Sequence, residues 1–436
     1  MKKTKPFAAP LWMLAAALLC VLALALFPKG EGAASAPLAG VPEAAPLPAP
    51  EGLRLAVASD THFDPDNTDK SAGLGETAWN MELLDALLYD AREQGAAFLL
   101  LTGDLCNSGR ENKHAALTEK LRTAEAAGLP VYVLPGNHDL APLTQTEFAA
   151  YYADFGYAEA TSRDEASLSY SVLRRDVLLL MMDTAGYRPG AMDLPGAPER
   201  TNNDGFLADA TLRWAEEQLK LAQARGLPVL AAGHYNLLPE ISRTPGSGYC
   251  VENAERFAQL LRDYGVKLYL SGHMHLRAVY EEEGLTEQLT ECLVAYPTAY
   301  TVLDLTADTI RVSPRRVDVD AWAAATGQDD PVLLDFADWQ QEQLYLSSRE
   351  TVFSMAKKNP ITEAEMESAV RFFYTLMDAY WRGALFEEKD EIARMEGYDP
   401  FFRAAEGYSY GWWLKDLLET VSPKLKGYAL GLMIEK

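Results

Sequence analysis

Histidine, aspartate and asparagine residues in this sequence recur just after short apolar segments that have the composition of β-strands. Five of the six histidines occupy such positions. The full set is Asp60, His62, Asp104, Asn137, His138, Asp139, His234, His273 and His275. Because open sheets place their sites at the carboxyl ends of strands, we expect these side chains to converge on one site.

The donor types in this set indicate a pair of metal ions. Carboxylate and amide oxygens combined with several imidazoles suit divalent cations of borderline hardness, namely Mn, Fe or Zn, whereas Mg prefers more oxygens. Two ions about 3.5–4 Å apart can hold one hydroxide between them and neutralise a phosphoryl oxygen. A single histidine after a strand is more often structural, so the joint occurrence carries this interpretation. His114, on a polar helix, receives no role.

The elements that would position these residues alternate between strand and helix. Strands are expected at 53–59, 98–102, 131–134, 229–232 and 266–270, with helices between most of them. This alternation favours parallel strands, and segments without an intervening helix, such as 167–173 and 177–182, favour additional antiparallel strands. We expect an α/β fold in which mixed β-sheets pack as a sandwich flanked by helices.

The chain divides into four segments, the first two of which concern targeting. In residues 1–29, Lys2, Lys3 and Lys5 precede the apolar stretch 11–27, which is typical of a membrane anchor or of a cleaved signal peptide. The basic flank places the N-terminus in the cytoplasm and the remainder outside, either anchored to the cell membrane or secreted. Residues 30–52 are rich in alanine and proline and are expected to be a spacer.

The other two segments are a catalytic region over 53–317 and an all-α C-terminal domain over 318–436. Thr362 and Glu365 form a potential capping box for a long helix. The aromatic residues of this region are expected to pack as a helical core. The helices could cover or border the site, or bind a partner or a second copy of the chain.

Composition excludes several classes of protein. With 48% hydrophobic residues the chain can bury a large core, and its net charge of −24 makes a nucleic-acid polymer an unexpected partner. Four cysteines are too few for a disulfide-dense scaffold. Cys106 is either a small buried residue that supports the site or a redox switch, and Cys250 and Cys292 could pair outside the cell.

The order of these motifs resembles that of the calcineurin-like metallophosphoesterase superfamily. The matching positions are Asp60-x-His62, Gly103-Asp104, Gly136-Asn137-His138-Asp139, His234 and Gly272-His273-x-His275. The resemblance covers about residues 53–315 and implies a metal-dependent phosphoric ester hydrolase that uses a metal-bridging hydroxide.

This resemblance also implies a role for each residue. Asp60, His62 and His275 would bind the first metal, Asn137, His234 and His273 the second, and Asp104 both. His138 would not be a ligand: it would hydrogen-bond a phosphate oxygen and protonate the leaving alkoxide, with Asp139 orienting its ring.

Two segments, 103–109 and 234–238, are similar to those of bacterial cyclic-nucleotide phosphodiesterases, of which one subgroup carries a helical C-terminal region. This similarity implies a phosphodiesterase acting on cyclic nucleotides or related small diesters. Asn107 would then face the phosphate, or else serve as a turn residue before Gly109. Tyr235 and Asn236 stand where many relatives have histidine or proline. The alternatives are a phosphomonoesterase or a cell-envelope phosphodiesterase, which export fits better, and a non-catalytic binding protein.

Overall fold

The computed structural model of the protein describes residues 52–68, 78–140, 142–185, 205–238, 249–420 and 432–435. The predicted anchor, and the predicted spacer apart from Gly52, lie outside these residues. Within the described part of the chain, no helix combines the length and the apolar character that crossing a membrane requires.

The first of two mixed sheets has the strand order β13-β12-β11-β1-β2-β3. Strands β1, β2 and β3 form its parallel half, and β11, β12 and β13 are added in antiparallel fashion. The bounds are β1 Leu53–Ala58, β2 Leu99–Thr102, β3 Val131–Leu134, β11 Ala299–Leu305, β12 Thr309–Arg316 and β13 Leu432–Glu435.

The second sheet has the order β4-β5-β6-β7-β8-β10-β9. Its parallel centre consists of β6, β7, β8 and β10, and the outer strands run antiparallel. The bounds are β4 Ser162–Arg163, β5 Tyr170–Arg174, β6 Val177–Met181, β7 Val229–Ala232, β8 Leu268–Ser271, β9 Ala278–Glu282 and β10 Leu285–Leu289.

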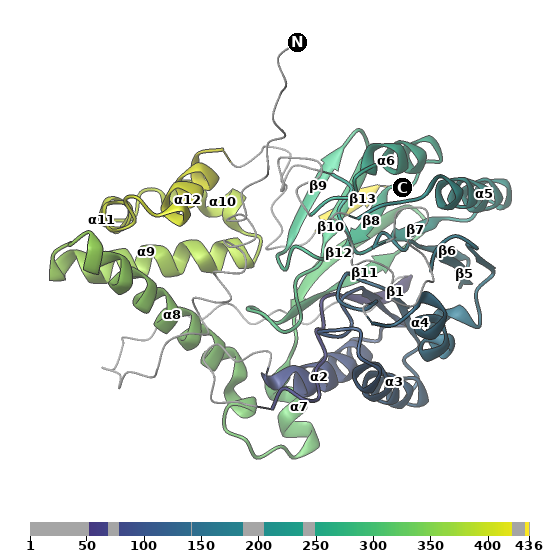
Figure 1. Ribbon diagram of the computed structural model, residues 1–436, viewed down its shortest axis with the longest axis horizontal. Coiled ribbons are helices and arrows are strands. Elements are labelled where there is room, and N and C mark those ends of the chain that lie inside the picture. Colours follow the sequence, from purple (N-terminus) through teal and green to yellow (C-terminus); the bar gives the residue numbers. More distant parts are fainter. Residues whose placement is uncertain are drawn as a thin grey trace, which may run out of the picture.

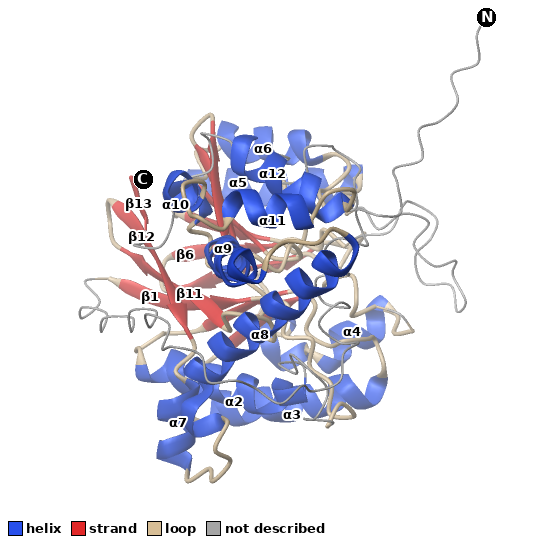
Figure 2. Cartoon of the chain, turned by 90° about the vertical axis from the view of Figure 1, so that its left-hand side faces the viewer, coloured by secondary structure: helices blue, strands red, loops and turns tan. Residues whose placement is uncertain are grey.

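Helices cover the two sheets from opposite sides. In Figures 1 and 2, α5 and α6 lie on one side of the strands, and α2, α3 and α7 lie on the other. The bounds are α2 Asn80–Glu93, α3 Glu111–Ala126, α4 Gln145–Tyr151, α5 Asp209–Arg225, α6 Ala254–Asp263 and α7 Val319–Thr326, with short helices at Ala153–Tyr157 and Leu333–Asp335. The predicted sandwich of mixed sheets with flanking helices is confirmed.

Strands β2 and β3 are almost entirely apolar in sequence because both of their faces are covered. Every residue of β2 and β3 is buried. The parallel register pairs Ala58 with Leu101 and Leu101 with Val133, so these strands end close to one another. The polar residues that follow these strands therefore lie close together at one edge of the first sheet.

The C-terminal region is mainly helical, as predicted. Its helices are α8 Phe336–Lys358, α9 Glu363–Trp381, α10 Leu385–Ile392, α11 Tyr398–Ala404 and α12 Ser409–Thr420. The Thr362 hydroxyl accepts from the Glu365 amide and the Glu365 carboxylate accepts from the Thr362 amide, which confirms the capping box. These helices share a core of their own, rich in phenylalanine and tyrosine, which confirms the expected aromatic packing.

Two features link this helical region to the sheets. Tyr296 Oη donates to Asp378 Oδ1 over 2.5 Å, and Gln340 Nε2 donates to Thr298 Oγ1 over 2.6 Å. The second link is β13, which pairs with β12. The expectation of helices alone after residue 317 is therefore wrong at Leu432–Glu435, because four residues are enough to extend a sheet edge and too few to show strand periodicity.

Candidate metal centre

The predicted ligands converge where strands of both sheets end. Loops after β1, β2 and β3 of the first sheet face loops after β7 and β8 of the second. Backbone hydrogen bonds tie neighbouring loops together: the Asp60 amide donates to Gly103 O, and the Gly272 amide donates to His234 O, each over 3.0 Å. The site thus lies at the junction of the two sheets.

One group of side chains consists of Asp60, His62, Asp104 and His275. One potential ligand atom from each lies within 4.8 Å of the others. The Nε2 atoms of His62 and His275 lie 3.1 Å apart, and His275 Nε2 lies 3.2 Å from Asp60 Oδ1. This spacing suits four donors around one cation.

A second group consists of Asp104, His234 and His273, with Asn137 beside it. His234 Nε2 lies 3.4 Å from Asp104 Oδ2 and 3.0 Å from Asn137 Oδ1. The other ring nitrogen of His234 donates to the Thr102 carbonyl over 2.9 Å, which leaves Nε2 free to act as a ligand. Asp104 belongs to both groups and is placed to bridge them.

The loops hold these residues in an unusual backbone conformation. Five of the predicted ligands have positive φ angles between 38° and 67°: Asp60, His62, Asp104, His273 and His275. The left-handed region is uncommon for residues other than glycine, and such strain concentrates at functional sites. A Cβ atom on Gly103 would meet the His234 ring, and one on Gly136 would meet the Asp104 carboxylate. These glycines therefore allow the ligand loops to approach one another.

The charges within the site favour a bound cation. Burial disfavours ionisation of Asp60, but the His275 imidazole outweighs it and holds the pKa of this carboxyl below its ordinary value. The pKa of Asp104 is likewise held low, against burial, by His234. Burial lowers the pKa of His62 to about 3, so its ring is neutral and can act as a ligand.

The pKa of His234 also shows that the site favours positive charge. Burial disfavours its protonated form, yet the Asp104 carboxylate prevails and raises the pKa of His234 to about 9. Asp60 Oδ1 is buried and accepts no hydrogen bond from the described part of the chain. The site thus offers two ionised carboxylates, of which Asp60 has an oxygen without a hydrogen-bond donor, and several imidazoles. This donor set fits divalent cations.

His138 lies beside both groups and belongs to neither. Its Nδ1 donates to the Asn107 carbonyl over 3.1 Å, and its Nε2 lies 3.9 Å from Asp104 Oδ2. The side chain is 42% exposed. An imidazole held in this way presents Nε2 to the space beside the ligands.

The prediction that Asp139 orients the His138 ring is wrong. The buried Asp139 carboxylate accepts from the backbone amides of Leu105, Cys106 and Gly136 over 2.8–3.1 Å. Both of its oxygens are used in this way, and the Asn107 carbonyl takes the ring nitrogen instead. Burial and the nearby Asp104 raise the pKa of Asp139 to about 6. Asp139 therefore joins the loops after β2 and β3.

Asn107 is exposed, and its side chain is held by a pair of residues that sequence analysis missed. Asn107 Nδ2 donates to Asp64 Oδ2 over 3.2 Å, and the buried Lys113 Nζ donates to the same oxygen over 2.6 Å. This ion pair fixes the residue whose carbonyl holds His138. This ion pair could not be predicted from a lysine on an expected helix, because only folding brings Lys113 close to Asp64.

The three described cysteines are buried and form no disulfide with one another, so the proposed pairing of Cys250 with Cys292 is not formed. Cys106 Sγ lies 3.6 Å from His114 Nδ1, and that nitrogen lies 2.7 Å from Tyr152 Oη. Burial raises the pKa of the Cys106 thiol, which fits the interpretation of a supporting residue. His114, expected on a polar helix, is thus buried in this network behind the site.

Comparison with known proteins identifies the class of protein that this fold and site define. Residues 53–277, just over half of the chain, match the calcineurin-like phosphoesterase family. The chain belongs to this family and is a metal-dependent phosphoester hydrolase. Residues 318–419 match a second family, the C-terminal domain of cyclic nucleotide phosphodiesterase.

Several solved structures are similar to the chain. A dimetal phosphatase from Danio rerio shares 12% identity at a TM-score of 0.47, covering 62% of this chain and 97% of that one. Purple acid phosphatase PPD1 from yellow lupin shares 13% identity at 0.43, covering 62% and 52%. GAP50 of Plasmodium shares 13% identity at 0.39, covering 60% and 84%. No curated protein sequence matches the chain significantly.

Proposed function

We propose that this protein is a phosphodiesterase for cyclic nucleotides or closely related small diesters. The observation that supports this substrate class is the match of residues 318–419 to the C-terminal domain of cyclic nucleotide phosphodiesterase, directly after a region with a full set of metal ligands. On this proposal residues 53–317 form the catalytic domain and residues 318–436 a companion domain.

Two divalent cations, each Mn, Fe or Zn, would be held by the two groups of side chains. Asp60, His62 and His275 would hold the first, Asn137, His234 and His273 the second, and Asp104 both. When bound, such cations neutralise the charge of a phosphoryl group and activate water for in-line attack.

The protein's own contribution to catalysis centres on His138. Because Nδ1 donates to the Asn107 carbonyl, Nε2 is the atom that faces the site. Protonated Nε2 can hydrogen-bond a phosphate oxygen and then give its proton to the departing alkoxide, the role of a general acid. The exposure of this side chain allows the proton to be replaced from solvent.

The test compares substrates on the full-length protein loaded with each metal. We expect bis-p-nitrophenyl phosphate to be hydrolysed faster than p-nitrophenyl phosphate, and a 3′,5′- or 2′,3′-cyclic nucleotide to be opened to a monoester. The Asp104→Asn variant, purified identically, controls for contaminating phosphatases. A preference for p-nitrophenyl phosphate would contradict the proposal and favour a phosphomonoesterase. Diesterase activity that spares all cyclic nucleotides would favour a cell-envelope substrate.

We also propose that residues 1–29 direct the catalytic domain across the cell membrane, either as an anchor or as a cleaved signal. Support comes from the basic residues that precede the apolar stretch 11–27. Protease treatment of intact cells producing the protein should remove the catalytic domain if it is anchored outside, and the culture medium should contain it if it is secreted. Protection inside intact cells would contradict the proposal.

A further inference from the structure

Cys292 lies against the backbone of a predicted metal ligand. It follows β10, and its segment runs beside the end of β1 through a bridge between Ser59 and Cys292. The Leu293 amide donates to Ser59 O over 3.2 Å, and Cys292 Sγ donates to Asp60 O over 3.2 Å. With 2% of its surface exposed, the thiol is held in place by the fold.

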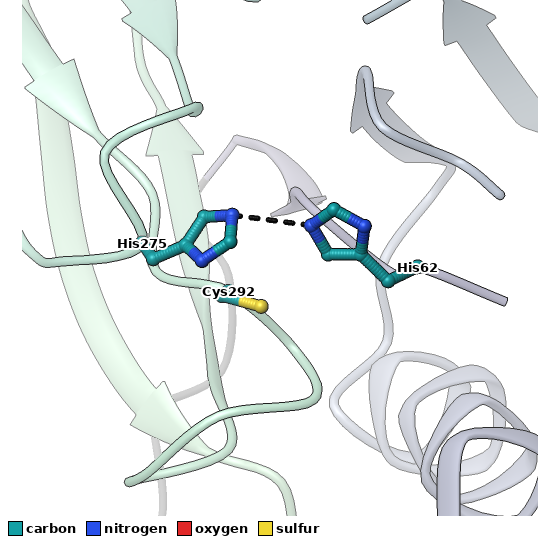
Figure 3. Close-up of side chains that lie close together, drawn as sticks. All are labelled: His62, His275 and Cys292. Carbon is teal, nitrogen blue, oxygen red and sulfur yellow. Dashed lines mark hydrogen bonds between the residues drawn. The ribbon is translucent and has the colours of Figure 1, made fainter. Parts of the chain in front are cut away.

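The sulfur also lies beside two imidazoles of the first group. Ligand atoms of His62, His275 and Cys292 all lie within 4.8 Å of one another. Figure 3 shows the two rings facing each other, with the Cys292 side chain next to them. The His62 and His275 nitrogens that face each other here, 3.1 Å apart, are the ones that also approach Asp60.

A second observation indicates that the two imidazoles border a place for a cation. Asp60 Oδ1 is buried, has no hydrogen-bond donor among the described residues, and lies 3.2 Å from His275 Nε2 and 3.9 Å from His62 Nε2. His62 and His275 thus belong both to the group that contains this oxygen and to the group that contains the Cys292 sulfur. The second group contains no sulfur among the described residues.

We propose that Cys292 is an additional, soft ligand of the first metal ion; this inference rests on the metal centre of the proposed function. Binding would replace the S–H bond by a sulfur–metal bond, and the thiol proton would pass to solvent. Because thiolates favour Zn and Fe(II) over Mn, the first position would select a softer ion than the second. The two positions would then differ in metal identity.

Cobalt substitution tests this directly, because a cobalt–thiolate bond produces a charge-transfer absorption in the near ultraviolet. Full-length protein loaded with Co(II) should show this band, and the Cys292→Ala variant should lack it. Cys250→Ser is the matched control, since Cys250 is also 2% exposed and belongs to no potential metal group among the described residues. The control should keep the band. If Cys292→Ala does not fold, Cys292→Ser replaces it, because serine keeps the size of the side chain and cannot produce a thiolate band. Cys106→Ser should keep the band, since the other described cysteine in a potential metal group is Cys106.

A competition between Zn and Mn gives a second measurement. We expect Cys292→Ala to weaken binding of Zn at one of two positions by about tenfold or more, with a smaller change for Mn. Two bound cobalt ions and diesterase activity without the thiolate band would overturn the role of Cys292 and leave the proposed function standing. Failure to bind metal would overturn both, whereas a thiolate band without hydrolysis of any diester would overturn the proposed function and leave the role of Cys292 standing.

Discussion

The two ligand groups share Asp104 but are supported from behind in different ways. Behind the first group, Arg277 follows His275 by two residues and forms a buried ion pair with Glu291. Behind the second, the buried Glu287 accepts from the amides of Leu237 and Leu238 and from the Ser271 hydroxyl over 2.6–3.1 Å. One support therefore consists of opposite charges, and the other of a carboxylate held by neutral donors.

Because of this difference, the two ligand groups depend on different parts of the molecule. A Cβ on Gly383, in the turn after α9, would meet the backbone and side chain of Arg277. The C-terminal helical region therefore packs closely against the loop of the first group. Burial, and then the nearby Arg382, lower the pKa of Arg277 to about 9. Glu287 instead lies on β10 of the second sheet. The first group is thus coupled to the C-terminal helices and the second to the sheet.

The residue shared by both groups should give the largest effect. Asp104→Asn removes the charge placed between the two groups, so we expect both metal positions to empty and phosphoester hydrolysis to fall to background. Elemental analysis of the purified variant, together with diester hydrolysis, measures this. Retention of one metal per chain would mean that Asp104 serves only one group, and the bridging assignment would then be wrong.

His138 should separate catalysis from metal binding. His138→Gln keeps a polar side chain but cannot act as a general acid, so we expect kcat to fall by about 10²–10⁴-fold. The metal content should stay at the wild-type level, because His138 belongs to neither group. Loss of metal from this variant would contradict the role proposed for the residue.

The convergence of the side chains in the two groups was predictable because strand ends of a parallel sheet share an edge, so residue type and position relative to the strands were sufficient. The Asp139 and Cys292 environments were not predictable in this way. Whether a carboxylate meets an imidazole or backbone amides depends on how two loops cross, and neither residue spacing nor periodicity encodes that crossing. Similarly, β13 becomes a strand only because β12 offers it an edge.

The ion pair behind the first group offers a way to perturb that group alone. Arg277→Met leaves Glu291 buried without its partner, and removing one member of a buried pair costs about 3–5 kcal/mol of unfolding free energy. We expect denaturant unfolding to show this loss, and metal analysis to show depletion at one position of two.

The matched control is the double variant Arg277→Met with Glu291→Leu, which removes both charges and should recover most of the stability. If the single variant released both metals equally, the separate support of the two groups would be refuted.

The support behind the second group should appear as a dependence on pH. Burial raises the pKa of Glu287 from 4.5 to about 7, against the hydrogen bonds that it accepts from Leu238, Ser271 and Leu237. Between these values the unfolded chain loses its proton before the folded protein does. The contribution of Glu287 to the free energy of unfolding is therefore complete below pH 4.5 and is lost as the pH rises toward 7, a change of about 3 kcal/mol.

Glu287→Gln cannot ionise, so its free energy of unfolding, measured across this pH range, should lack the part of the slope that comes from Glu287. Glu291→Gln should retain that part of the slope. Equal slopes for wild type and Glu287→Gln would show that Glu287 is ionised in the folded protein throughout, and that the two supports respond alike to pH.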